Sequence, residues 1–191
     1  ILSCITLYKF FQKHIIMKIF IITDERCGGT VFTRIFTDVF GLRRIHDPQT
    51  DTLKKIPDLD IKYNIIELLD YCYNVKKFNV LKCCYCSFSF NEYTEIINYV
   101  SNNNIKIIFL HRENVFDRAL SLAVARTLKS IGYNNTYGYK DTNIIKPYNL
   151  NLNIYVKELI RHDKDYKNII QYLNENEIKY VIGMLYQKSF N

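Results

Sequence analysis

The sequence lacks the patterns that identify the commonest nucleotide-binding loops. It contains neither G-x-x-x-x-G-K-[ST], whose backbone cradles phosphates, nor the dinucleotide-binding pattern G-x-G-x-x-G. Glycine itself is scarce, with 6 Gly, 3 Pro and no Trp in 191 residues. Typical ATPases, kinases and NAD-dependent enzymes are therefore disfavoured, and an anion-binding loop in this chain has to be built from few glycines.

Basic residues are numerous but do not gather in runs. The formal net charge is +7, which favours anionic partners such as phosphorylated small molecules. No stretch holds five consecutive Lys or Arg residues, and this argues against a nucleic-acid-binding tail. We therefore expect a small anionic ligand and no nucleic acid.

No apolar run is long enough to span a membrane. Residues 1–16 are apolar but are interrupted by Lys9, Lys13 and His14, whereas a span needs about 20 apolar residues. No small-residue cleavage site follows them, which disfavours a signal peptide. We expect no transmembrane span, and an amphipathic surface segment is the alternative for residues 1–16.

The cysteines are not spaced as two CxxC pairs, so a structural zinc site is disfavoured and no metal is expected. Cys84 and Cys86 fall in an apolar, strand-like stretch, where a thiol behaves as a small buried hydrophobe. Reduced, buried thiols are typical of cytoplasmic proteins, and we expect that location. The 6 cysteines are Cys4, Cys27, Cys72, Cys83, Cys84 and Cys86.

The length suits one α/β domain with a substantial core. Because Met17 opens a clean apolar run, residues 1–16 are expected to be a non-native or disordered N-terminal extension. Residues 17–191 are expected to form a single domain. The sequence stops soon after its last strand-like stretch, which leaves C-terminal truncation open.

Strand-like and helix-like segments alternate along the chain. Residues 17–23 are an almost continuous apolar run, as in a buried parallel strand. Val31, Ile35 and Val39 then recur at helical spacing and predict the apolar face of a helix, flanked by phenylalanines, and Asn91 is the expected N-cap of a later helix. The alternation predicts a three-layer α/β domain with a central parallel sheet of about four or five strands. The expected strands are 17–23, 41–46, 78–88, 105–110 and 178–185, and the expected helices are 30–40, 62–75, 91–101, 114–130 and 153–176.

A loop with two glycines follows the first expected strand. A helix that starts directly after a strand offers backbone N–H groups to an anion, and glycine lets the anion approach closely. An arginine before the glycines adds a fixed, bidentate cation, and a threonine after them adds a hydroxyl. The sequence therefore predicts an anion-binding loop, with a plain tight turn as the alternative. Its residues are Arg26, Cys27, Gly28, Gly29 and Thr30.

A second candidate anion site follows the strand expected at 105–110. Arg112 comes at its carboxyl end, and Ser121 lies nine positions further on in the next helix. Both side chains can face the cleft that forms at the carboxyl ends of parallel strands. Two alternatives stay open: Arg112 in a surface ion pair with Glu113 or Asp117, and Ser121 as a neutral helix residue.

Together the two segments resemble sulfotransferases. RCGGT is similar to the 5′-phosphosulfate loop of these enzymes, and FLHRENVFDRALSLAVA is similar to their 3′-phosphate segment. The residues around these two segments resemble the bacterial, trehalose-sulfotransferase-like branch of the family. IHDPQ and NVLKCCY give weaker matches, and the resemblance runs from Met17 to about Val181. It implies a P-loop-like nucleotide fold and transfer of a sulfuryl group from 3′-phosphoadenosine 5′-phosphosulfate (PAPS) to a hydroxyl or amine of a small-molecule or carbohydrate acceptor.

The resemblance also implies residue roles. Arg26 and the N–H groups of the 26–30 loop would neutralise charge on the transferred group. The same loop, through Thr30, would hold the 5′-phosphate, while Arg112 and Ser121 would hold the 3′-phosphate. Asp47 is the first candidate for the general base and His46 the second. Lys82 would contact the sulfuryl group or be an ordinary strand residue.

The chain departs from the family pattern at two loop positions and leaves other functions open. Cys27 and Gly29 stand where hydroxyl residues are usual, so two donors are lost. A nucleotide-binding pseudoenzyme or fragment of the same fold is therefore the first alternative. A kinase-like α/β protein with a degenerate loop and a nucleic-acid-binding module are the others.

Overall fold

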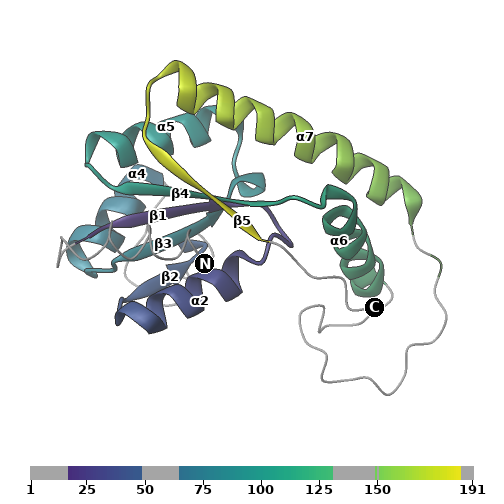
Figure 1. Ribbon diagram of the computed structural model, residues 1–191, viewed down its shortest axis with the longest axis horizontal. Coiled ribbons are helices and arrows are strands. Elements are labelled where there is room, and N and C mark those ends of the chain that lie inside the picture. The colour runs from purple at the N-terminus through teal and green to yellow at the C-terminus, as the bar shows by residue number, and fades with distance from the viewer. Residues whose placement is uncertain (1–16, 49–64, 131–148, 150, 186–191) are drawn as a thin grey trace.

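The computed structural model describes residues 17–48, 65–130, 149 and 151–185. Its centre is a five-stranded sheet in which every neighbouring pair of strands is parallel, with the order β2-β3-β1-β4-β5 (Figure 1). The predicted parallel sheet is confirmed. The strands are β1 (Ile19–Thr23), β2 (Arg44–His46), β3 (Val80–Cys84), β4 (Lys106–Arg112) and β5 (Tyr180–Leu185).

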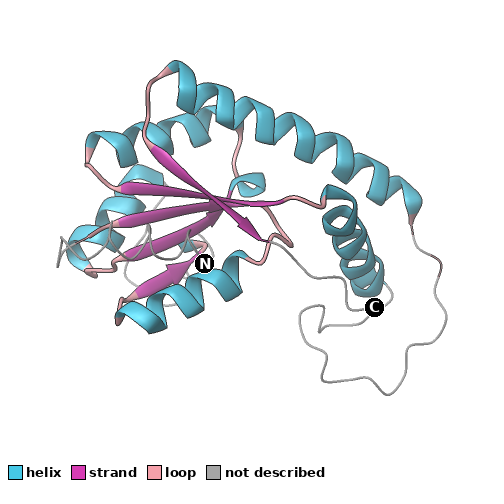
Figure 2. Cartoon of the chain, in the orientation of Figure 1, coloured by secondary structure: helices cyan, strands magenta, loops and turns pink. Residues whose placement is uncertain are grey.

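Helices connect the strands, as Figure 2 shows. A π-helical turn continues α4, and a short 3₁₀ helix, Tyr85–Ser87, follows β3. The longest helix, α7, leads into β5 at the edge of the sheet. The helices are α2 (Gly29–Phe40), α4 (Ile65–Asp70) with its π-helical turn Tyr71–Val75, α5 (Phe90–Asn102), α6 (Val115–Ser130) and α7 (Leu152–Glu175).

Both faces of the sheet are buried, which explains the continuous apolar run in β1. Ile19 and Ile21 pack on one face with Phe36 of α2. Phe20 and Ile22 pack on the other face, in the larger core that α4, α5 and α7 complete. The helices of the two faces and the sheet between them form the three layers that the alternating pattern predicted. Side chains in the larger core include Leu69, Tyr93, Ile96, Ile97, Phe109, Ile169 and Leu173.

The predicted apolar face of α2 is wrong. Val31, Ile35 and Val39 are 62%, 60% and 70% exposed. The buried side is centred on Phe36, whose ring lies between those of Phe32 and Phe40 at centroid distances of 5.7 and 5.0 Å. Phenylalanine removes more apolar area from water than valine or isoleucine does, so the aromatic stripe decides which side of the helix faces the sheet.

The expected N-cap of α5 is also corrected. Ser89, not Asn91, caps this helix: its hydroxyl accepts from the N–H of Glu92, and the Glu92 carboxylate accepts from the N–H of Ser89 at 2.8 Å. The S-x-x-E pattern at 89–92 is the sequence signal for such a reciprocal capping box.

Several predictions fall partly or wholly outside the described residues. These are the extension at 1–16, which includes Cys4, and residues 62–64 of the expected helix 62–75. The division into an extension and a single domain 17–191 stays a prediction. Within the described ranges, no helix has the length and apolar character that a membrane crossing requires.

Candidate functional site

A cavity of about 730 Å³ lies at the carboxyl ends of β1, β2 and β3. One part of its wall is the loop between β1 and α2, a second part comes from the ends of β2 and β3, and a third from α6. A volume of this size suits a nucleotide-sized ligand. The lining residues are Thr23, Asp24, Glu25, Arg26, Gly28, Gly29, Thr30, Val31, Asp47, Lys82, Cys84, Ser87, Leu122, Ala125, Arg126 and Lys129.

The loop between β1 and α2 has the backbone conformation of an anion-binding turn. Arg26 and Gly28 both have left-handed backbones, with φ of 63° and 70°. Left-handed residues within a short loop are the units from which concave groups of N–H donors are built. Gly28 is also the N-cap of α2 and provides no side-chain cap, so the first N–H groups of the helix face the loop uncapped. Gly28 and Thr30 are exposed and line the cavity.

Gly29 lines the cavity and also has a structural role that the sequence did not indicate. A Cβ on Gly29 would lie 2.8 Å from Cγ2 of Thr23, the last residue of β1. A side chain there would push α2 away from the strand. Gly29 is therefore required by the close contact of helix and strand, whatever the loop binds.

Cys27 lies beneath the loop and does not line the cavity. Its side chain is buried, and burial together with the nearby Asp24 carboxylate raises the pKa of the thiol to about 11. Cys27 is therefore a neutral thiol at physiological pH. Only its backbone remains close to the proposed anion position, where its N–H is held by the Asp24 carbonyl oxygen at 3.4 Å.

Asp47 and Lys82 form a pair on the wall opposite α6. Lys82 Nζ lies 2.5 Å from Asp47 Oδ2, and the N–H of Cys84 donates to Asp47 Oδ1 at 2.9 Å. Asp47 itself has a left-handed backbone, with φ of 42°. His46 is half-buried and does not appear among the lining residues, whereas Asp47 does.

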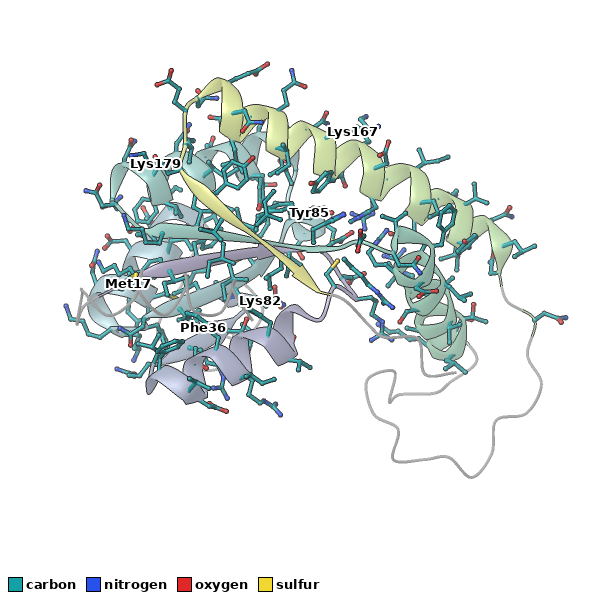
Figure 3. All side chains as sticks on the ribbon, viewed as in Figure 1. Met17, Phe36, Lys82, Tyr85, Lys167 and Lys179 are labelled. Carbon is teal, nitrogen blue, oxygen red and sulfur yellow. The ribbon has the colours of Figure 1, made fainter. Side chains whose placement is uncertain are left out.

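Lys82 is charged in this setting. Burial lowers the pKa of its ammonium, but the neighbouring Cys84 and Asp47 raise it by more, so the net shift is upward. The side chain of Lys82 is nevertheless only 5% exposed. Figure 3 labels it at the carboxyl side of the sheet, near α2. A fixed, buried cation at a cavity wall can stabilise negative charge in the cavity as well as on Asp47.

Arg112 is the last residue of β4, two residues beyond the predicted end of that strand. Its Nη1 donates to the carbonyl oxygen of Arg26 at 3.4 Å, so the two candidate anion segments are in direct contact. Its Nη2 also lies 3.8 Å from Asp117 Oδ2, which is the surface ion pair considered as the alternative. Ser121 follows Asp117 by one helical turn and is half-buried. Neither Arg112 nor Ser121 belongs to the cavity wall.

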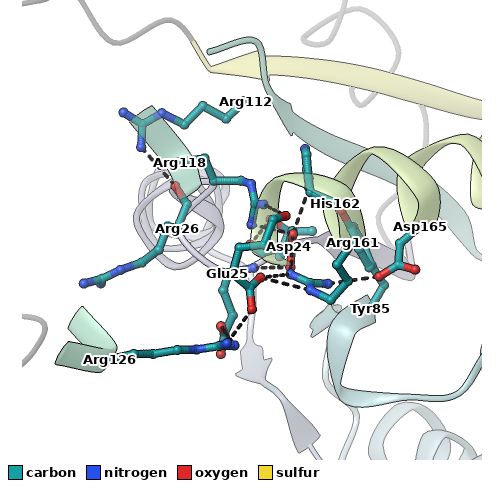
Figure 4. Close-up of polar contacts among 12 residues, drawn as sticks. Asp24, Glu25, Arg26, Tyr85, Arg112, Arg118, Arg126, Arg161, His162 and Asp165 are labelled. Carbon is teal, nitrogen blue, oxygen red and sulfur yellow. Dashed lines mark hydrogen bonds and ion pairs between the residues drawn. The ribbon is translucent and has the colours of Figure 1, made fainter. Parts of the chain in front are cut away.

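Sequence reasoning missed a cluster of charges beneath the loop. Asp24 and Arg118 are fully buried as side chains and lie 2.8 Å apart. Arg161 and His162 of α7 contact the same carboxylate, as Figure 4 shows. A signal existed in the sequence. Arg118 shares the helical stripe of Leu122, where a charge is tolerated only with a buried partner.

The electrostatics of Asp24 make it an anion throughout the physiological range. Burial raises the pKa of its carboxyl, but the hydrogen bond from His162 and the charges of Arg161 and Arg118 bring it well below its usual range. The stabilisation that this carboxylate contributes is present above the unfolded pKa of about 4 and is lost progressively at lower pH. At neutral pH the cluster is fully formed.

Comparisons with known proteins assign the chain to no family. No protein-family profile matches the sequence, and no curated protein matches it. A shikimate kinase from Bacteroides thetaiotaomicron is 14% identical with a TM-score of 0.36, over 86% of this chain and 84% of that one. A deoxyadenosine kinase from M. mycoides, with dCMP and dCDP bound, is 13% identical with a TM-score of 0.36, over 89% of this chain and 90% of that one. Likenesses at this level assign no activity to the chain.

Proposed function

We propose that this protein is a sulfotransferase that binds PAPS across the β1–α2 loop and the end of β4, and passes its sulfuryl group to a hydroxyl or amine. The observation that carries the proposal is the contact between Arg112 and the carbonyl oxygen of Arg26. It joins the two segments that resemble the 5′- and 3′-phosphate sites of sulfotransferases. A ligand with anionic groups at both ends of a nucleotide fits such an arrangement.

The residues present fit this cofactor in charge. Four cations of the cavity wall, Arg26, Lys82, Arg126 and Lys129, outnumber its three carboxylates, Asp24, Glu25 and Asp47. Uncapped N–H groups at the start of α2 suit the 5′-phosphate, and Arg112 suits the 3′-phosphate because a guanidinium binds phosphate bidentately. Ser121 supplies a neutral donor one turn from Asp117, on the side of α6 that Arg112 approaches.

The reaction requires alignment and charge stabilisation from the protein. PAPS supplies the sulfuryl group. Arg26 and the loop N–H groups stabilise negative charge that develops on the transferred group and its leaving phosphate. Lys82 offers a second fixed cation from the opposite wall. Asp47, on the same wall, accepts the proton of the acceptor hydroxyl or amine, and His46 is the alternative base.

A pseudoenzyme that binds the cofactor without turnover is the second candidate. One observation favours it: both oxygens of Asp47 already accept hydrogen bonds, from Lys82 and from the N–H of Cys84. One lone pair on each oxygen is thus already engaged, and only the remaining lone pairs can accept a proton from a substrate. Turnover with a generic phenol or alcohol acceptor separates the two candidates, whereas cofactor binding is common to both.

The experiment that tests the cofactor is calorimetry with two nucleotides, 3′,5′-bisphosphoadenosine and 5′-AMP. We expect Arg112→Ala to weaken binding of the bisphosphate by roughly 1.5–3 kcal/mol, the range for hydrogen bonds to charged groups, and to leave 5′-AMP nearly unchanged. Ser121→Ala removes one neutral donor, so we expect about 0.5–1.5 kcal/mol, again only for the bisphosphate.

Arg43→Ala is the matched control. Arg43 precedes β2 at the amino end of the sheet, where its guanidinium lies over the ring of Phe78, so its loss changes the net charge by the same amount away from the site. Equal losses for both nucleotides in Arg112→Ala, or no loss, would show that Arg112 does not read a 3′-phosphate. The sulfotransferase proposal would then fail.

A further inference from the structure

The anion-binding loop has a second, buried side that its proposed function leaves unexplained. Asp24 begins the loop and points away from bulk solvent, with a side chain that is 0% exposed. Its carboxylate accepts from Arg118 Nη1 at 2.8 Å, from Arg161 Nη2 at 3.0 Å and from His162 Nδ1 at 2.8 Å. The N–H of Glu25 donates to the same carboxylate at 2.8 Å. Two helices far along the chain thus hold one residue of the loop.

A second connection runs from Glu25, the next residue of the loop, to α7. Glu25 pairs with Arg126 of α6 at 3.3 Å, and Arg126 also pairs with Glu158 of α7. Glu158 in turn accepts from Arg161 Nη2 at 2.8 Å. The charges therefore alternate without a break from Glu25 through Arg126, Glu158 and Arg161 to Asp24 (Figure 4).

Arg161 occupies the point where the two connections meet. Its guanidinium contacts Asp24, Glu158 and Asp165 together. A planar guanidinium that donates to three carboxylates fixes their relative positions, which a flexible lysine ammonium does less well. Arg161 is not among the residues that line the cavity. Its effect on a bound anion is therefore indirect.

We propose that Arg161 of α7 is a positioning residue for the anion-binding loop, which it holds in its binding conformation through Asp24 and, by way of Glu158 and Arg126, through Glu25. The proposal rests on the proposed function in that the loop binds the cofactor phosphate. It assigns a part in the site to α7, a helix that begins more than a hundred residues after the loop. Preorganised N–H donors bind and stabilise anions better than donors that must first be ordered.

The test is amide hydrogen exchange combined with calorimetry on Arg161→Gln in the full chain. We expect exchange in residues 24–30 to rise about tenfold, while exchange in β4 stays at the wild-type rate. We expect affinity for 3′,5′-bisphosphoadenosine and for inorganic pyrophosphate to fall about three- to thirtyfold, which lies within the range of couplings between residues of one charge network. A residue that only stabilises the fold would raise exchange in β4 as well, which would overturn the proposal.

Two further variants complete the experiment. Lys164→Gln removes the same charge from an exposed site on α7, three residues from Arg161, and is expected to leave loop exchange and affinity unchanged. Arg161→Lys keeps the charge but loses the planar fork, so we expect intermediate values. It also carries the test if Arg161→Gln does not fold. Wild-type loop exchange and wild-type affinity in a folded Arg161 variant would overturn the proposal.

Failure of the proposed function gives a different result. A wild-type protein that binds pyrophosphate but does not prefer the 3′-phosphorylated nucleotide would contradict PAPS binding. The loop exchange in the Arg161 variants is measured without any ligand. Its change, or its absence, therefore decides the positioning role of Arg161 independently of which nucleotide the site takes.

Discussion

Asp24 and Asp47 are the same residue type in equivalent places, yet their carboxylates differ in burial and in charged partners. Each directly follows a strand at the carboxyl edge of the sheet, Asp24 after β1 and Asp47 after β2. The Asp24 carboxylate is fully buried and receives two arginines and a histidine. The Asp47 carboxylate is 25% exposed and pairs with Lys82.

The difference indicates which carboxylate is available for chemistry. A buried anion surrounded by several cations is fixed in position and protonation state, and it serves to hold neighbouring segments together. A half-exposed carboxylate on a cavity wall can meet a substrate and exchange a proton with it. Three predictions test this contrast, and they are given in order of decreasing expected effect.

The largest expected effect is that of Arg118→Met, which disrupts the buried charge cluster around Asp24. The substitution replaces the guanidinium by an apolar side chain of similar length, so the buried Asp24 carboxylate loses one of its compensating positive charges. We expect the free energy of unfolding to fall by about 3–5 kcal/mol, as for loss of one partner of a buried ion pair. Urea denaturation followed by circular dichroism measures this quantity.

Lys167→Met is its control. It removes an exposed pair with Asp163, whose two side chains are 69% and 64% exposed, and should cost less than about 1 kcal/mol. Comparable losses in the two variants would mean that the buried cluster beneath the loop contributes no more than a surface pair, and the contrast between Asp24 and Asp47 would disappear.

The Asp47 side is tested by turnover. Asp47→Asn can still accept from the N–H of Cys84 but cannot take a proton, so we expect the rate of sulfuryl transfer to fall at least about 100-fold. Affinity for 3′,5′-bisphosphoadenosine should change little, because the proposed phosphate positions lie at the β1–α2 loop and the end of β4. Stopped assays of product formation and calorimetry give the two numbers.

His46→Gln is the matched comparison for Asp47→Asn. Loss of turnover in His46→Gln with full activity in Asp47→Asn would move the general base to His46. A wild-type protein that binds the bisphosphate without measurable turnover would instead support the pseudoenzyme.

The loop between the two carboxylates is tested by Arg26→Ala. We expect binding of 3′,5′-bisphosphoadenosine to weaken by roughly 1.5–3 kcal/mol, because one charge-assisted contact to an anion is lost. Arg34→Ala, on the exposed side of α2, is the control for net charge. Unchanged affinity in Arg26→Ala by calorimetry would count directly against the loop as the anion site.

Elements with a strong local signal were predictable. The apolar runs at 17–23 and 105–110 form strands of a parallel sheet that is buried on both faces. Such strands are continuously apolar, so the sequence distinguishes them from surface segments. Arg26 and Gly28 were expected in a loop after β1 and lie there, whereas Thr30 already belongs to the first turn of α2. The roles of these residues stay predictions.

Elements that depend on competition between neighbours were not predictable. Val31 and Phe36 belong to two different apolar stripes of α2. The aromatic stripe is the one buried on the sheet, because it removes more apolar area from water. Cys84 and Cys86 were expected to be buried, but both are half-buried: Cys84 is the last residue of β3 and lines the cavity, and Cys86 lies in the 3₁₀ turn that follows.

The sequence by itself determined the order of strands and helices along the chain and the place of the glycine-containing loop after β1, because these follow from local periodicity and from glycine at a strand end. Only the tertiary structure decided how the loop is held. Asp24 contacts Arg161 across 137 residues of chain, and no local pattern records a contact of that separation. Burial then makes the pairing necessary, since an isolated charge in the interior is far more costly than one in water.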